Sequence, residues 1–147
     1  MTSKEYLMQI YNLDHKIYMM QLEADEYRRL ADVIPGGNYD KPFAKPSNRN
    51  TEAPFVKWIN KALDKEKEIE KEIERLNNLK VEVTSVISQI DNGNYRMVLM
   101  LRYLKSMKIE EIAETMHYSI PSVKRWHREA LEVLVVPSKY ESLLEKS

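Results

Sequence analysis

MKIEEIAETMHYSIPSVKRWHR, residues 107–128, is the stretch that decides the fold of the C-terminal part of this chain. Apolar residues three or four apart predict a short helix over about 109–116, in which the small Ala113 suits a close helix crossing. A second apolar stripe follows the turn His117-Tyr118-Ser119 and predicts a helix over about 119–136; its members are Ile120, Val123, Trp126, Ala130, Leu131 and Leu134. Two helices joined by so tight a turn are typical of a helix-turn-helix.

The face of the second helix that lies away from its apolar stripe is polar and basic. The candidate DNA-binding residues on or beside this face are Ser119, Pro121, Ser122, Lys124, Arg125, His127 and Arg128. Lysine and arginine neutralise phosphates, and an arginine can bind a guanine edge. Serine is a good N-cap, and proline is tolerated in a first turn. The cations alone would also suit an ordinary solvated face; the turn and the two stripes favour DNA.

One more short helix, over about Tyr95–Lys105, is expected before these two, so that 92–136 forms a three-helix domain and 137–147 a tail. The segment Asp91-Asn92-Gly93-Asn94 is expected to end the preceding helix and to cap this one.

The N-terminal part, residues 1–91, carries two heptad seams, and two such helices predict an antiparallel coiled-coil hairpin. The first helix, about 3–34, is capped by Thr2 or Ser3 and has the seam Tyr6, Ile10, Leu13, Ile17, Met20, Ala24, Tyr27, Ala31 and Ile34. The second, about 54–91, has the seam Phe55, Ile59, Ala62, Glu66, Ile69, Ile73, Leu76, Lys80, Val83, Ile87 and Ile90. A proline-rich linker over 35–54 joins them. Two interpretations stay open for the charged seam residues Glu66 and Lys80: they fix the register or the partner, or they extend from an imperfect seam into water.

Composition excludes several classes of site. Among the 147 residues there is no cysteine, so disulfides and thiolate metal sites are impossible. The formal net charge is zero, yet residues 92–147 hold nine Lys/Arg and seven Asp/Glu, a surplus of +2. His117 and His127 are ten residues apart with no paired carboxylate at metal-ligand spacing, and His15 is expected on the flank of the first seam. No phosphate-binding glycine loop is present. We therefore expect no catalytic site, metal or cofactor. With neither an apolar leader nor a membrane span, we expect a cytoplasmic protein.

The segments Leu99–Leu104, Met107–Met116, Ser119–Arg125 and Ala130-Leu131 together resemble region 4 of sigma-70-type factors, a helix-turn-helix that binds a promoter element. The resemblance covers about 40 residues. The whole arrangement, long helices before such a module, resembles phage and prophage regulators of the RinA/ArpU type, which are taken to activate late or packaging genes. It implies double-stranded DNA as a partner, with RNA polymerase and a second copy of the chain as candidate partners.

The chain departs from the region 4 pattern at two positions in particular. Its turn carries His117 where glycine is usual, and histidine tolerates a positive φ better than most residues. Lys108 stands where a Ser or Thr cap is usual.

The leading hypothesis is thus a sequence-specific DNA-binding transcription regulator and not an enzyme. One alternative is a small terminase-like protein that packages DNA. Another is a helical adaptor that docks on RNA polymerase without touching DNA, in which case neutralising Lys124, Arg125 and Arg128 would leave function intact.

Overall fold

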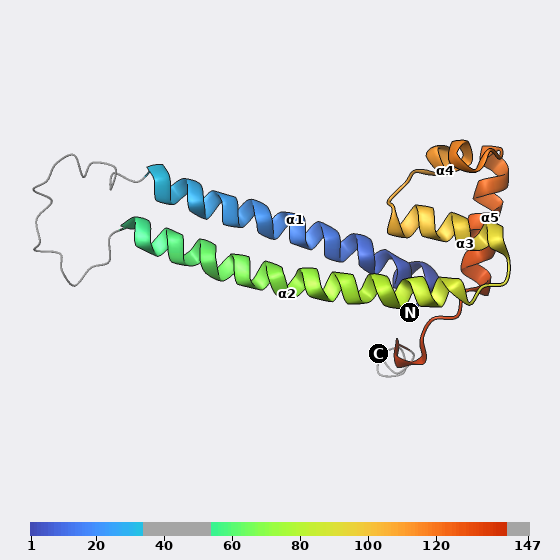
Figure 1. Cartoon of the computed structure of the whole chain (residues 1–147), viewed down its shortest axis with the longest axis horizontal. Coiled ribbons are helices and arrows are strands. Elements are labelled where there is room, and N and C mark those ends of the chain that lie inside the picture. Colours follow the sequence, from blue (N-terminus) through green and yellow to red (C-terminus); the bar gives the residue numbers. More distant parts are fainter. Residues whose placement is uncertain (34–53, 141–147) are drawn as a thin grey trace, which may run out of the picture. The chain divides into compact units, whose positions relative to one another are not determined.

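A computed structural model describes residues 1–33 and 54–140, and within them the chain is all-α, as predicted. The elements are α1 (Ser3–Val33), α2 (Pro54–Ser88), α3 (Gly93–Leu99), the π-helical turn η3 (Met100–Leu104), α4 (Ile109–Met116), α5 (Ile120–Val133) and the 3-10 turn η4 (Ser138–Tyr140) (Figure 1). The predicted linker lies outside the described residues except for Pro54, which begins α2. Seam residue Ile34 and the tail beyond residue 140 also lie outside them.

Two compact units make up the chain. The hairpin unit is His15–Glu74, and the C-terminal unit combines Met1–Asp14 with Arg75–Ser147. The division into 1–91, 92–136 and 137–147 stays a prediction.

In the hairpin unit, α1 and α2 run side by side in opposite directions (Figure 1). Lys16 Nζ lies 3.6 Å from Glu72 Oε1, and Lys65 Nζ lies 3.0 Å from Glu23 Oε2. The later residue of α1 therefore pairs with the earlier residue of α2. This order confirms the antiparallel pairing of the two long helices.

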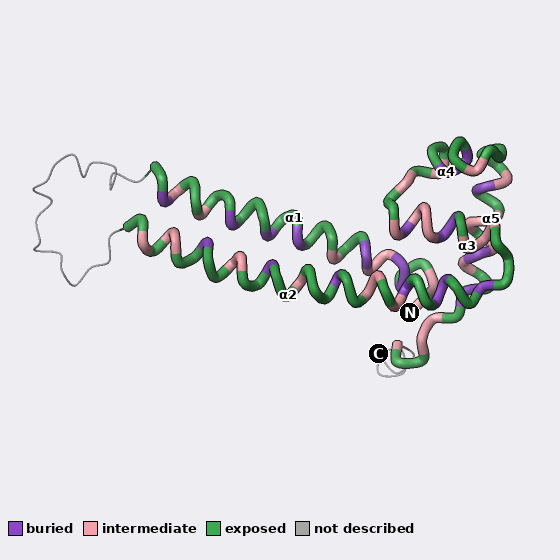
Figure 2. Tube along the Cα trace, viewed as in Figure 1, coloured by how far each residue is buried: buried purple, intermediate pink, exposed green. Residues whose placement is uncertain are grey.

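The predicted seam of α1 is the buried side of that helix in the hairpin unit (Figure 2). Its members are all buried or half-buried: Ile17, Met20, Ala24, Tyr27 and Ala31. On α2 the prediction is wrong at two positions, since Phe55 and Ile73 are 44% and 38% exposed. A straight α-helix drifts by ~20° per heptad from a repeat of 3.5 residues, so a residue at a seam position can rotate away from the other helix. The carboxylate of Glu72, beside Ile73, points to α1 instead.

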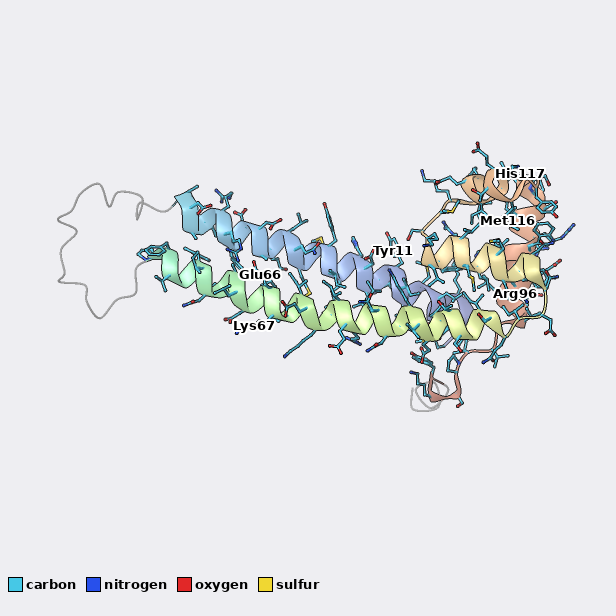
Figure 3. The ribbon with its side chains drawn as sticks, in the orientation of Figure 1. Tyr11, Glu66, Lys67, Arg96, Met116 and His117 are labelled. Atoms are coloured by element: carbon cyan, nitrogen blue, oxygen red, sulfur yellow. The ribbon has the colours of Figure 1, made fainter. Side chains whose placement is uncertain are left out.

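The charged seam residue Glu66 is paired across the hairpin. Arg28 donates two hydrogen bonds to its carboxylate, from Nε at 2.7 Å and from Nη2 at 3.0 Å. Bidentate hydrogen bonds of this kind set the relative orientation of the two side chains and pair their charges. They also hold the pKa of Glu66 below its usual range. Figure 3 shows Glu66 between the helices and Lys67 outside them. For Glu66, pairing that fixes the register is therefore the better interpretation.

The described part of the C-terminal unit has two groups of buried apolar side chains. The start of α1 and the end of α2 bury the first, whose members include Tyr6, Leu7, Ile10, Val83, Val86, Ile87 and Ile90. The second lies among α3, η3, α4 and α5: buried Val98, Ile112, Ala113 and Val123, with Leu101, Met107, Ile109, Met116 and Trp126 packed against them. This second cluster fixes the angle between α4 and α5.

Several helix boundaries differ from the predicted ones. The second long helix ends at Ser88 and not near residue 91. The helix expected over Tyr95–Lys105 is α-helical only to Leu99 and continues as the wider turn η3, where Lys105 N–H donates to Met100 O at 3.2 Å. The last helix ends at Val133 and not at 136. Pro137 has no N–H for the carbonyl of Val133, so the helix could not have run much further.

The predicted caps between α2 and α3 are present. Asn92 Oδ1 accepts the N–H groups of Asn94 (2.9 Å) and Tyr95 (3.2 Å). Arg96 donates from Nη1 to the carbonyl oxygens of Ile90 and Asp91, and so satisfies acceptors left by the end of α2. Thr2 caps α1 by accepting the N–H of Glu5 at 3.1 Å.

Candidate nucleic-acid interface

The turn between α4 and α5 is built on a left-handed residue. His117 has φ 62° and ψ 41°, and Figure 3 shows it where α4 ends. Its N–H donates to Glu114 O at 3.3 Å, and the N–H of Tyr118 donates to Ala113 O at 3.0 Å. These two bonds form a Schellman motif, which usually has glycine at the left-handed position. The positive φ expected for His117 is confirmed.

α4 begins with half of a capping box. Lys108 has the extended backbone of an N-cap, and its N–H donates to Glu111 Oε1 at 3.3 Å. The lysine side chain has no acceptor, so it cannot return a bond to the first turn. The predicted absence of a side-chain cap at this position is confirmed. The hydrogen bond to Glu111 partly compensates for the missing cap.

At the start of α5, Ser119 is the predicted N-cap. Its Oγ accepts the N–H of Ser122 at 3.3 Å and donates to Ser122 Oγ at 2.8 Å. The carbonyl of Ser119 accepts the N–H of Val123, and Pro121 has no N–H. The first turn therefore offers few donors to a phosphate, and anion binding on α5 depends on side chains.

The predicted cations lie on the solvent face of α5. Lys124, Arg125 and Arg128 are all exposed, whereas Val123 and Ala130 are fully buried. At 100° per residue, Pro121, Arg125 and Arg128 share the face opposite the buried side. Arg125 Nε lies 3.8 Å from Glu129 Oε1, a loose exposed pair.

His127 lies on the inner side of α5, unlike the other predicted site residues. Its Nε2 is 2.8 Å from the phenol oxygen of Tyr103, and the two rings stack at 5.7 Å. Burial lowers the pKa of His127, and the nearby charges of Arg102 and Lys4 lower it further. The structure thus brings six predicted residues to the exposed surface or start of α5 and turns the seventh toward the core.

The turn η4, which follows α5, is bonded to the rest of the C-terminal unit. Glu82 of α2 accepts hydrogen bonds from Tyr6 Oη (3.0 Å) and Tyr140 Oη (3.2 Å) and forms an ion pair with Lys139. The rings of Tyr6 and Tyr140 meet edge to face at 5.2 Å. Residues 138–140, which follow α5, are therefore held against both long helices.

Sequence reasoning missed two exposed apolar residues beside the turn. Tyr118 is 50% exposed and touches Trp126 edge-on at 4.7 Å, and Ile120, the first residue of α5, is 39% exposed. The stripe pattern assigned Ile120 to the core. Ile120 is the first member of the stripe and lies in the first turn of the helix. A terminal turn has neighbours on one side only, so this position could have indicated that Ile120 is exposed.

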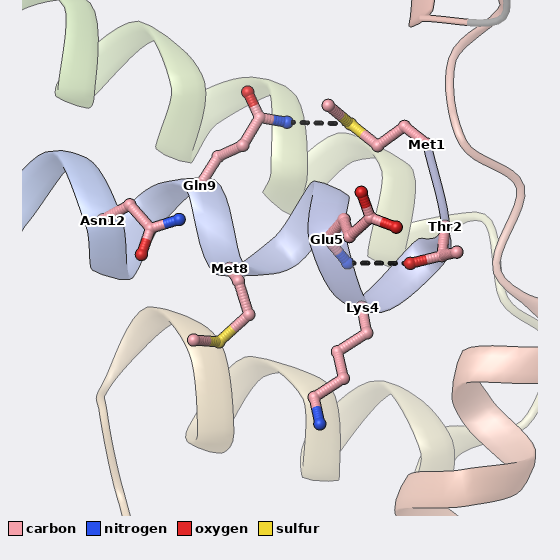
Figure 4. A pocket seen from close by; sticks show the side chains of 7 residues that line it. All are labelled: Met1, Thr2, Lys4, Glu5, Met8, Gln9 and Asn12. Carbon is pink, nitrogen blue, oxygen red and sulfur yellow. Dashed lines mark hydrogen bonds between the residues drawn. The ribbon is translucent and has the colours of Figure 1, made fainter. Parts of the chain in front are cut away.

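Among residues 1–33 and 54–140, no three His, Asp or Glu side chains are grouped so that they could hold a metal ion. None of the helices in these two ranges meets the length and hydropathy that a membrane span needs. A cavity of about 580 Å³ lies along the start of α1 (Figure 4), lined by Met1, Thr2, Lys4, Glu5, Met8, Gln9 and Asn12.

Comparison with protein families gives one finding. Residues 93–134 match the family model for sigma-70, region 4. The match covers α3 to α5, which are therefore a sigma-70 region 4-like helix-turn-helix. It indicates DNA binding and a role related to transcription, since this region is a DNA-binding regulatory domain and not a catalytic one. Comparisons with curated proteins and with solved structures returned no match.

Proposed function

We propose that this chain is a sequence-specific DNA-binding regulator of transcription, with α5 as the helix that enters the major groove. The observation that carries the proposal is the arrangement of α5 within the region 4-like module. One side of the helix is buried in the module, and the other presents three exposed cations. A recognition helix needs this division between packing and contact.

The exposed residues of α5 suit different roles. Lys124 and Arg128 are a turn apart and fit phosphates on the groove edge. Arg125 lies nearer the middle of the outer face and is the residue we assign to a guanine edge. Ser122 keeps a hydroxyl proton to donate, because its Oγ accepts from Ser119. His127 is left out of the contact surface.

The finer parts of the proposal rest on other grounds. Activation of phage late or packaging genes rests on the likeness of the arrangement to RinA/ArpU-type regulators. Contact with RNA polymerase follows from the role of region 4. A homodimer through the hairpin would put two modules on repeated half-sites, and sedimentation of the full chain would test it. We place the protein in the cytoplasm because DNA is its partner.

The test measures binding of the full chain to a DNA site, first selected from random duplexes, over a series of salt concentrations. In one variant Lys124, Arg125 and Arg128 are all changed to alanine. Its affinity should fall, and the slope of log affinity against log salt should shrink by about 0.9 for each phosphate that the variant no longer neutralises. In the control variant, three exposed lysines of α2 are changed to alanine: Lys57, Lys67 and Lys71. This variant should keep both the affinity and the slope of the wild type.

Equal binding by wild type and the α5 variant would refute a DNA-contacting role for α5. Circular dichroism and thermal unfolding of both variants would show that the fold is intact.

One observation favours the adaptor as a second candidate. All three charged residues of α4, Glu110, Glu111 and Glu114, are acidic and exposed. The first helix of a helix-turn-helix crosses the DNA backbone, where carboxylates are repelled, whereas a basic protein surface would attract them. Changing Glu110 and Glu114 to glutamine should strengthen DNA binding if α4 lies near phosphates. If the wild type shows no DNA binding and the change abolishes capture of RNA polymerase, the adaptor is favoured.

A further inference from the structure

The start of α5 presents apolar side chains where a recognition helix meets the bases. Ile120 and Pro121 are the first two residues of α5, and both are exposed. In helix-turn-helix proteins the N-terminal residues of the second helix contact base edges. Two of the residues best placed for base contact in this chain therefore have no hydrogen-bonding side chain.

The polar groups around this pair are mostly engaged. The hydroxyl of Ser119 donates to Ser122 Oγ and accepts the N–H of Ser122, so it serves the cap. Only the hydroxyl proton of Ser122 is left to donate from this serine pair. The helix start therefore has few free hydrogen-bond donors, and its two exposed apolar side chains are left to make apolar contacts.

We propose that Ile120 and Pro121 recognise the C5-methyl group of thymine. This methyl is the apolar group that the base pairs display in the major groove. The inference rests on the proposed function, because it needs α5 in that groove. The apolar pair is continuous with the cationic face, since Lys124 follows Ile120 by one turn and Arg125 follows Pro121 by one turn. Phosphate contacts by those cations would hold the pair against the bases.

Ile120 is 39% exposed and Pro121 is exposed, so both keep surface that a base could contact. Ile120 is not among the residues of the cluster that fixes α4 against α5. Its neighbour Tyr118 directs its ring to Trp126. Burial of one methyl or methylene group contributes ~0.8 kcal/mol. Because ~1.4 kcal/mol corresponds to a tenfold change in affinity, contact with one thymine methyl is expected to change the affinity about fourfold.

The experiment uses the full chain and the duplex selected from random DNA. Each thymine is replaced in turn by deoxyuridine, which pairs identically and lacks only the methyl group. Fluorescence anisotropy then gives the dissociation constant for wild type, for Ile120→Ala and for the control Val133→Ala. Val133 is an exposed residue at the other end of α5, 49% accessible. We expect deoxyuridine to weaken binding by wild type and by Val133→Ala about fourfold at a particular thymine. Ile120→Ala keeps only Pro121 of the apolar pair, so deoxyuridine should weaken its binding less.

The outcomes separate this inference from the function beneath it. If wild type selects a site but no deoxyuridine weakens it, or if Ile120→Ala remains equally sensitive, thymine recognition by this pair is overturned and DNA recognition stands. If wild type selects no site at all, both are overturned.

Discussion

The phenol oxygen of Tyr103 and Nε2 of His127 are 2.8 Å apart, and this contact joins the turn η3 to the middle of α5. Tyr103 is buried, with its pKa raised by burial, and the pKa of His127 is lowered, chiefly by burial. Near neutral pH both rings are therefore uncharged, and the contact is a neutral hydrogen bond. It orients α5 from its inner side.

The first prediction concerns pH. Because the folded pKa of His127 lies below the unfolded value of ~6.5, the unfolded chain binds the proton first. His127 should thus lower the free energy of unfolding as pH falls below about 6.5, until the folded pKa is reached. Urea unfolding of wild type and His127→Gln at pH 7.5 and pH 5.5 measures this. The wild type should lose more stability than the variant over that range.

The variant keeps every other side chain of the wild type, so the comparison isolates His127. Equal losses of stability in wild type and His127→Gln would show that His127 is not held neutral by the fold.

The second prediction concerns the left-handed turn. Changing His117 to glycine removes the strain of a positive φ and should raise the free energy of unfolding by about 0.5–1 kcal/mol. Ser106, with φ 56°, should respond in the same direction. Glu114→Gly, inside α4, should instead destabilise by about 0.5 kcal/mol. Chemical denaturation compares the three variants, and a destabilising His117→Gly would contradict the turn geometry.

The third prediction concerns the start of α4. Lys108 has φ −77° and ψ 156° and no side-chain acceptor. Lys108→Ser should complete the capping box with Glu111 and raise the free energy of unfolding by about 0.5–1 kcal/mol. Lys105→Ser makes the same change of charge away from the cap and should not stabilise. Equal effects of the two variants would assign any gain to charge and not to capping.

The fourth prediction concerns the hydrogen bond from Tyr140 to Glu82. Tyr140→Phe keeps the ring and removes the hydroxyl that donates to Glu82, and should cost about 1 kcal/mol of unfolding free energy. Tyr140→Ala also removes the edge contact with Tyr6 and should cost about 1 kcal/mol more. Thermal unfolding ranks the two variants. An unchanged midpoint for Tyr140→Ala would mean that residues 138–140 contribute nothing to the unit.

Local features of this protein followed from the sequence. The seams of α1 and α2, the caps at Thr2, Asn92 and Ser119, and the left-handed His117 depend on residues within a few positions of each other. Helical periodicity and capping act over one or two turns, so the order of residues suffices to locate them. The bounds of α4 were predicted to the residue for the same reason.

The tertiary structure decided what each helix face touches. The sequence placed His127 with the cations and Ile120 with the core; packing puts His127 against Tyr103 and leaves Ile120 exposed. Arg28 with Glu66, and Tyr140 with Glu82, join residues 38 and 58 positions apart. Periodicity defines a face only to within about one residue, or ~100° of helix rotation. The neighbouring helix sets the rest, because only contact between distant segments determines which edge of a stripe is covered.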